Sequence, residues 1–132
     1  MCGIAGWFNL GPGAPAPDRD ILAAMGGALA HRGPDDEGIE CRSSWGLVSR
    51  CLAIIGVEAG HQPLSNEDGT VWVAFNGEIY NHHDLRRELE KRGHSFSGTA
   101  DTEVLVHLYE EYGDALVDHL QGMFAFALID TR

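Results

Sequence analysis

Two short segments of the sequence carry residue types that together could perform acyl transfer. Cysteine is the second residue, so removal of Met1 would leave a chain that starts with both a thiol and a free α-amine. The pKa of an α-amine is about 7.7–8.0, so this amine could accept the proton of the thiol, directly or through a water. Nucleophile and base would then lie on one residue, Cys2. The alternative is a bystander cysteine, because any small residue can follow an initiator methionine.

The second segment is Asn76-Gly77, which could stabilise the oxyanion that forms when a thiolate attacks a carbonyl. A side-chain amide and a backbone N–H are a common pair of donors for a tetrahedral oxyanion, and glycine lets a substrate approach the backbone. The alternative is a two-residue hairpin turn, for which Asn-Gly is the best sequence. The residues that follow, 78–81 (EIYN), fit an ordinary hairpin poorly and favour the catalytic interpretation.

In the first half of the chain we expect a strand, a helix and further strands to position these residues. Residues 2–10 are mostly apolar and predict a strand, and the proline- and glycine-rich residues 11–17 predict a loop. Asp18 can cap the helix that follows. Its apolar face has helical spacing and comprises Ile21, Leu22, Met25 and Leu29. Residues 45–55 predict one or two strands.

The second half predicts a strand, two helices and a last strand. Residues 70–81 are the strongest strand signal, interrupted at Asn76-Gly77. Two helices, each with a capping residue and a terminating glycine, are expected at residues 81–93 and 101–113, with Asn81 and Asp101 as caps. Residues 122–130 are apolar on both faces, as in a central strand. Because strict strand-helix-strand alternation is absent, we expect an α+β fold with antiparallel sheets.

Length and charge limit the class of protein. The chain has 132 residues, enough for one domain or part of one. Its 9 Lys and Arg against 20 Asp and Glu give a net charge of −11, which argues against binding to nucleic acid or anionic membranes. The sequence shows neither a signal peptide nor an apolar run of about 20 residues, so we expect a cytoplasmic location.

The cysteines and histidines do not predict a metal site. Cys2, Cys41 and Cys51 are odd in number and too far apart in sequence for a disulfide framework or a zinc knuckle. His82 and His83 are adjacent, and neighbouring side chains diverge in any regular structure. We therefore expect no metal and no cofactor in this domain.

Five segments together resemble one family. They are CGI at residues 2–4, HRGPD at 31–35, NGEIYN at 76–81, DTE at 101–103 and LQGMFAFALID at 120–130. In order and approximate spacing the sequence resembles the glutaminase domain of class II glutamine amidotransferases, in the asparagine synthetase branch, over all 132 residues. The resemblance implies an N-terminal-nucleophile hydrolase fold, a four-layer αββα sandwich. It also implies that the domain continues beyond Arg132, so that residues 1–132 are an incomplete glutaminase domain.

The resemblance assigns roles to individual residues. Cys2 would attack the side-chain amide of glutamine and release ammonia, while Asn76 and Gly77 hold the oxyanion. Asp101 would bind the α-ammonium of glutamine. Further glutamine contacts would come from Glu78, Ile54 and Ile55, and from the position of Cys51. The HRGPD segment is interpreted mainly as a helix stop and a shaped turn, with no catalytic role for His31.

The resemblance also implies partners outside this sequence. The ammonia would be used by a C-terminal synthetase domain or partner chain, which binds ATP and Mg²⁺ and amidates a carboxylate, aspartate by default. Neither that domain nor its ATP-binding loop is in the sequence. A homodimer is left open.

One position departs from the family pattern. The family has an arginine, which grips the glutamine α-carboxylate, where this chain has Cys51. Arg50 is adjacent, but neighbours on a strand point to opposite faces, so it should not replace the missing group. A second hypothesis follows: the domain is a weakened or inactive scaffold of a synthetase that uses free ammonia or cyclises its substrate.

Overall fold

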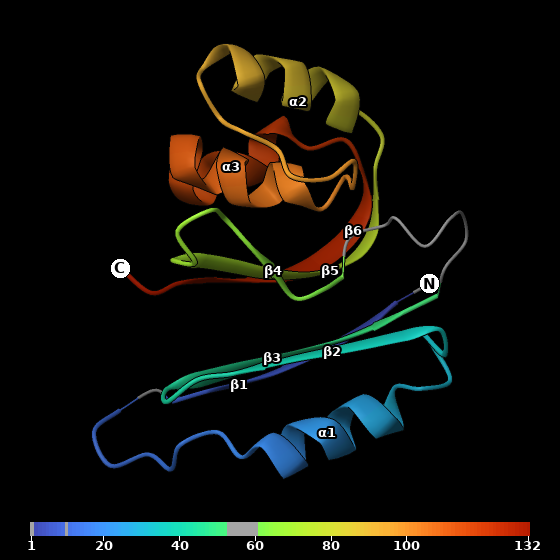
Figure 1. Cartoon of the computed structure of the whole chain (residues 1–132), viewed down its shortest axis with the longest axis vertical. Helices are drawn as coiled ribbons and strands as arrows, with labels where there is room; N and C mark the ends of the chain where they lie inside the picture. The colour runs from blue at the N-terminus through green and yellow to red at the C-terminus, as the bar shows by residue number, and fades with distance from the viewer. Residues whose placement is uncertain (1, 10, 53–60) are drawn as a thin grey trace.

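The computed structural model describes residues 2–9, 11–52 and 61–132, and these form four layers (Figure 1). One outer layer is helix α1 (Arg19–Ala28). The inner layers are two antiparallel three-stranded sheets. The other outer layer contains helices α2 (His82–Lys91) and α3 (Glu103–Tyr112) and the 3₁₀ segment η1 (Gly113–His119). The described residues thus show the predicted αββα sandwich and its α+β class.

The first sheet has the order β1-β3-β2 and carries the N-terminus of the described chain. Its strands are β1 (Gly3–Phe8), β2 (Asp36–Cys41) and β3 (Trp45–Cys51). Residues alternate between the faces of β3. Leu22 of α1 lies where a side chain on Gly46 would be, so Gly46, Val48 and Arg50 face α1. Trp45, Leu47, Ser49 and Cys51 therefore face the second sheet.

The second sheet has the order β4-β5-β6, with strands β4 (Leu64–Ser65), β5 (Val71–Ile79) and β6 (Gly122–Asp130). Its helix-side residues Val71, Val73, Phe75 and Ile79 are buried against α2 and α3. The alternate residues Trp72, Ala74, Asn76 and Glu78 consequently face the first sheet. Asn76 and Cys51 thus point into the same layer between the sheets.

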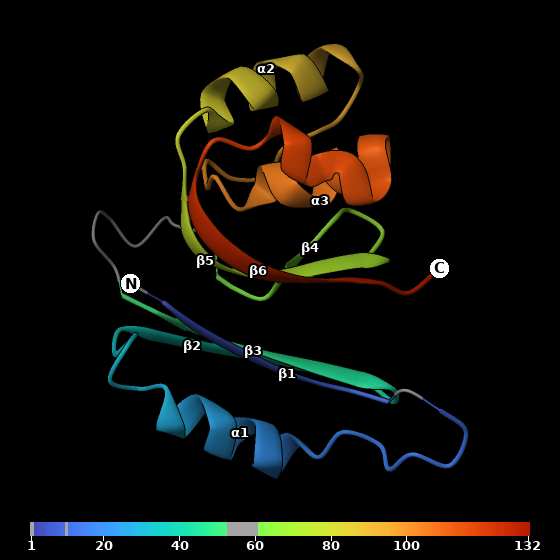
Figure 2. The ribbon, with the colours of Figure 1, turned by 180° about the vertical axis from the view of Figure 1, so that it is seen from behind.

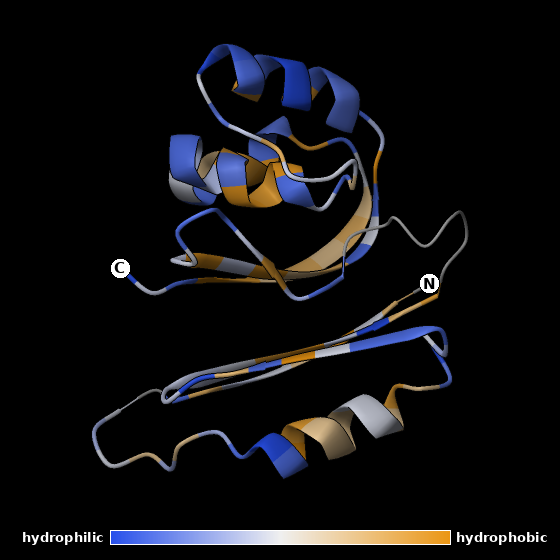
Figure 3. Ribbon diagram, in the orientation of Figure 1, coloured by the Kyte–Doolittle hydropathy of each residue, from blue (hydrophilic) through white to orange (hydrophobic). Residues whose placement is uncertain are grey.

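Two apolar clusters hold these layers together. The larger lies between the second sheet and its helices and includes Leu85, Leu89, Leu105 and Leu108. The smaller lies between the sheets and is built on Trp45, Leu47, Ala74 and Ile129. Figure 3 shows the apolar side of α3 turned toward the second sheet and a hydrophilic α2 outside it, and Figure 2 shows the same layers from behind. Among the described residues, no helix has the length and apolarity needed to span a membrane.

Most predicted elements are confirmed, and two details are wrong. Strand β2 was not predicted, because residues 36–41 (DEGIEC) lack an apolar alternation. Asn76-Gly77 does not interrupt its strand, since β5 continues through it and Gly77 pairs with Phe124 of β6. Strand β6 is covered on both faces as predicted, with Phe124, Phe126 and Leu128 in the cluster beside the helices and Ala127 and Ile129 in the cluster between the sheets.

The capping predictions are partly wrong. Asp18 caps α1 as predicted, and its side chain accepts a hydrogen bond from the N–H of Asp20 at 2.7 Å. Asn81 is at the N-cap of α2, but its side chain bonds the backbone of His119 and Gln121 instead of the helix. The N-cap of α3 is Thr102, which leaves the carboxylate of Asp101 for another partner.

Candidate active site

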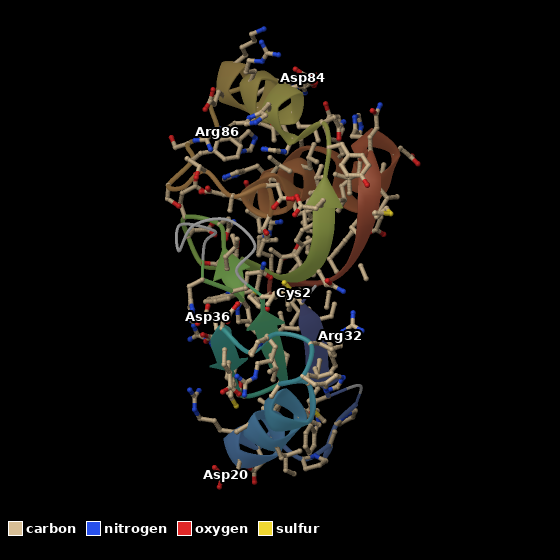
Figure 4. All side chains as sticks on the ribbon, turned by 90° about the vertical axis from the view of Figure 1, so that its right-hand side faces the viewer. Cys2, Asp20, Arg32, Asp36, Asp84 and Arg86 are labelled. Atoms are coloured by element: carbon tan, nitrogen blue, oxygen red, sulfur yellow. The ribbon has the colours of Figure 1, made fainter. Side chains whose placement is uncertain are left out.

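Cys2 lies between the two sheets, immediately before β1 (Figure 4). Its backbone nitrogen donates a hydrogen bond to Asn76 Oδ1 at 3.0 Å, across 74 positions of sequence. The pairing of β1 with β3 explains this position of Cys2. The register of β1 against β3 pairs Gly3 with Arg50, so its continuation places Cys2 opposite Cys51. The fold therefore brings together the predicted nucleophile Cys2, the predicted oxyanion donor Asn76 and Cys51, which stands where the family has an arginine.

The HRGPD segment holds the backbone of Cys2 from the other side. Arg32 Nε donates a hydrogen bond to the carbonyl oxygen of Cys2 at 3.2 Å, and Figure 4 shows Arg32 close to Cys2. Gly33 is packed so tightly on β3 that a Cβ there would lie 2.4 Å from the carbonyl carbon of Arg50. The glycine thus lets the segment approach β3 closely enough for Arg32 to reach Cys2. The sequence predicted mainly a helix stop and a shaped turn here, and this role of Arg32 was not predicted.

Asn76 is oriented by its contact with Cys2. Because Oδ1 accepts the hydrogen bond from the Cys2 nitrogen, Nδ2 is the group of this side chain that can donate to a substrate. In a chain from which Met1 has been removed, the same Cys2 nitrogen would be the α-amine. One contact would then fix the position of the base and the direction of the oxyanion donor.

Gly77 presents its N–H at the edge of β5 that faces away from β6. The N–H of Phe75 donates to Gln62 Oε1 at 2.7 Å, and the N–H of Ile79 donates to Asp101 Oδ2 at 2.9 Å. Because N–H groups alternate between the two edges of a strand, the N–H of Gly77 points to this same edge. The N–H of Gly77 therefore lies between two N–H groups that are already hydrogen-bonded, those of Phe75 and Ile79, and it can donate to an oxyanion.

Glycine is required at position 77. Its φ of +150° is in a region that other residues rarely adopt, and a Cβ would lie 2.2 Å from the carbonyl oxygen of Met123. Because Asn76 and Gly77 lie inside β5 and pair with Ala125 and Phe124 of β6, the hairpin-turn alternative is wrong.

Asp101 lies at the end of β5 because its carboxylate accepts the N–H of Ile79. The bond uses Oδ2 and leaves Oδ1 for an ammonium group. Glu78 is exposed on β5, and its charge acts on the Cys2 thiol. Glu78 therefore lies near Cys2, and Asp101 is held at the end of the strand that carries Asn76 and Gly77.

Cys51 changes the protonation of Cys2. A hydrogen bond from the Cys51 thiol is the largest cause that lowers the pKa of Cys2, from 9.0 to about 6. The Leu52 backbone N–H lowers it further, while burial and the charge of Glu78 oppose the change. The pKa of Cys51 is raised, chiefly because its proton is held in the bond to Cys2. Cys51 also contacts Ser49 Oγ at 3.6 Å. The hydrogen bond between the two side chains thus favours the thiolate at Cys2 and the protonated thiol at Cys51.

Arg50 does not replace the missing family arginine. Its Nε donates to the carbonyl oxygen of Gly26 at 3.1 Å, and its Nη2 lies 3.2 Å from Glu37 Oε2. Only 16% of its side chain is exposed, on the face of the sheet that α1 covers. The prediction that Arg50 points away from the site is confirmed. The predicted contacts at Ile54 and Ile55 lie outside the described residues.

Comparisons with known proteins identify the fold and the family of this chain. The fold is similar to that of the glutamine phosphoribosylpyrophosphate (PRPP) amidotransferase of B. subtilis, with a TM-score of 0.73 at 22% identity over 99% of this chain and 35% of that one. The two proteins therefore share a fold. In sequence, residues 1–132 match the glutamine amidotransferase domain family. The chain belongs to that family.

Two relatives carry more specific names. The chain is 46% identical over 129 residues to asparagine synthetase [glutamine-hydrolyzing] 1 of Bacillus subtilis, covering 97% of this chain and 20% of that protein. It is 46% identical over 132 residues to asparagine synthetase [glutamine-hydrolyzing] 2 of Oryza sativa subsp. japonica, covering all of this chain and 22% of that protein. The chain thus spans about a fifth of the length of these relatives.

Proposed function

We propose that this domain hydrolyses the side-chain amide of glutamine, with Cys2 as the nucleophile. The observation that supports this most is the bond from the Cys2 nitrogen to Asn76 Oδ1, which joins the two predicted halves of the site. The lowered pKa of Cys2 supports it further, because the thiolate is the reactive form of cysteine. Both curated relatives are named as glutamine-hydrolysing enzymes.

The reaction follows from the positions of these groups. The Cys2 thiolate attacks the δ-carbonyl carbon of glutamine, and the resulting oxyanion accepts hydrogen bonds from Asn76 Nδ2 and the N–H of Gly77. The α-amine of Cys2, which has accepted the proton of the thiol, gives it to the amide nitrogen of the intermediate; this nitrogen leaves as ammonia and a glutamyl thioester remains. Water then cleaves the thioester to glutamate and restores the thiol. Retention of Met1 should abolish hydrolysis, since the Cys2 nitrogen is then an amide and no longer a base.

Asp101 and Cys51 determine how glutamine is held. The free oxygen of Asp101 suits the α-ammonium of glutamine, in a charge-assisted contact. The α-carboxylate meets Cys51 where the family has arginine, and Arg50 is engaged with Glu37 on the other face. We therefore expect glutamine to bind weakly, with hydrolysis retained.

For the complete protein we propose the reaction indicated by its relatives' names. The ammonia would pass to a C-terminal synthetase domain that binds ATP and Mg²⁺ and amidates a carboxylate, aspartate by default. The relatives are about five times as long as this chain, which leaves room for that domain.

A second function is favoured by one observation. The position that should hold the glutamine carboxylate carries a thiol, which suits a scaffold domain of a synthetase that uses free ammonia or cyclises its substrate. The two functions differ in whether Cys2 becomes acylated.

The test is to trap the thioester. The complete protein is mixed with glutamine, quenched in acid within the first turnovers, and its N-terminal peptide is analysed by mass spectrometry. We expect a glutamyl adduct on Cys2 that is absent from Cys2→Ser and from protein that retains Met1. A wild-type peptide that stays unmodified at saturating glutamine would support the scaffold instead.

A further inference from the structure

A cluster of two histidines and a glutamate lies in the helical layer, on elements other than those that carry Cys2. His107 and Glu110 are three residues apart on α3 and share one face of the helix. His94 follows the end of α2, where its N–H donates to the carbonyl of Leu89 and closes the helix after Gly93. The backbone positions of His94, His107 and Glu110 are thus set by the two helices and by the hydrogen bond that ends α2.

The three side chains converge on one point. The two Nδ1 atoms of His94 and His107 are 3.2 Å apart. Glu110 Oε2 is 3.0 Å from His107 Nδ1 and 3.3 Å from His94 Nδ1. A tetrahedral Zn²⁺ with bonds of about 2.0 Å separates its ligand atoms by about 3.3 Å. The triangle therefore has the dimensions of one face of a tetrahedral metal site.

Hydrogen bonding alone satisfies this triangle poorly. Each pair of atoms is at hydrogen-bond distance, but a neutral histidine has one N–H, and the carboxylate has none. If His94 donates its Nε2–H to Glu111, its Nδ1 is a bare lone pair that faces both the second histidine and the carboxylate. A divalent cation would accept all three lone pairs at once.

His94 and Glu110 also make hydrogen bonds to residues outside the triangle, of the kind that orient metal ligands. His94 Nε2 lies 2.9 Å from Glu111 Oε1, and Glu111 Oε2 in turn accepts a bond from Arg92 at 3.0 Å. Glu110 Oε1 accepts a hydrogen bond from Asn66 Nδ2 at 2.6 Å, which leaves Oε2 for the cluster. Histidine ligands typically donate their second nitrogen to a carboxylate in this way.

Burial favours a site of this kind. His107 is 1% exposed, and the ring of Phe96 packs edge-on against it at 4.6 Å. The side chains of His94 and Glu110 are 15% and 21% exposed, so the site is open on one side. Two imidazoles and one carboxylate suit Zn²⁺ among the first-row divalent metals, and a water would complete the tetrahedron.

We propose that His94, His107 and Glu110 bind a divalent transition metal, with Zn²⁺ as the best fit. The sequence predicted no metal in this domain, because His94 and His107 are separated by twelve residues and belong to different elements. The metal would fasten the start of the segment between α2 and α3 to α3. The same segment ends at Asp101, and its middle is already held by bonds from Ser97 and Gly98 to Glu103. The proposal does not depend on glutamine hydrolysis.

The test uses Co²⁺ as a spectroscopic probe and Zn²⁺ by calorimetry, on the complete protein freed of metal by a chelator. We expect wild type to bind one more equivalent than His94→Gln and Glu110→Gln, with the intense visible absorption typical of tetrahedral Co²⁺ lost in both variants. The exposed histidine variant His61→Gln is the matched control and should bind as wild type does. Glu111→Gln should bind about 10–100-fold more weakly, because it removes only the orienting contact.

Circular dichroism shows whether each variant is folded, and none of them replaces the buried His107. Equal stoichiometry and equal absorption in wild type and His94→Gln would overturn the proposal.

Discussion

The dependence of the Cys2 thiolate on Cys51 gives the sharpest prediction. With a pKa of about 6, Cys2 is about 90% ionised at pH 7, whereas a thiol at the ordinary 9.0 would be about 1% ionised. The Cys51 thiol is the largest cause that lowers this pKa. Cys51→Ala removes the donor, so we expect the pKa of Cys2 to rise by at least about one unit. Below that pKa the thiol is protonated, so reactivity at pH 7 should fall.

The assay is the rate of Cys2 alkylation by iodoacetamide between pH 5 and pH 10, followed on the N-terminal peptide by mass spectrometry. Cys51→Ser is the matched control, because its hydroxyl still donates, and its midpoint should lie between those of wild type and Cys51→Ala. Cys41→Ala, which changes a cysteine on β2 that bonds Pro17, should leave the midpoint unchanged. A Cys51→Ala midpoint equal to that of wild type would refute the reasoning.

Three further predictions concern substrate binding and the backbone of the site. Cys51→Arg should lower the KM for glutamine by on the order of 10–150-fold, because a bond to a charged group contributes roughly 1.5–3 kcal/mol; an unaltered KM would show that another group holds the carboxylate. Arg32→Ala should slow acylation of Cys2 while thermal unfolding changes little, because it removes the bond to the Cys2 carbonyl; an unchanged single-turnover rate would contradict this positioning role. Gly77→Ala should destabilise the fold by about 1–3 kcal/mol in denaturant unfolding, because its Cβ would collide with the backbone of Met123 on β6; wild-type stability would contradict the described register.

Part of the candidate site could be predicted because residue type and strand alternation can be read from short stretches of sequence. The N-terminal cysteine and the Asn-Gly pair each suggest their chemistry from residue type, and strand alternation correctly placed Arg50 on the face opposite Cys51. The fold class followed from the order of strands and helices. These inferences need only neighbours in sequence.

What the sequence could not show depends on contacts between distant elements. Strand β2 is held by pairing with β3, whereas its own residues have weak strand propensity. Asp101 would suit a helix cap, but the N–H of Ile79 at the end of β5 binds its carboxylate instead. Arg32 reaches Cys2 only because Gly33 can pack on β3. Each of these outcomes is set by tertiary packing that overrides local preference.

The measurement that tests the central claim most directly is ammonia release from glutamine by the complete protein with Met1 removed, compared with Cys2→Ala. Ammonia and glutamate should appear in equal amounts from wild type and be absent from Cys2→Ala, whose fold should be intact because Cys2 precedes β1. Ammonia release that persists in Cys2→Ala, or that is absent from folded wild type at saturating glutamine, would contradict the assignment of Cys2 as the nucleophile of a glutaminase.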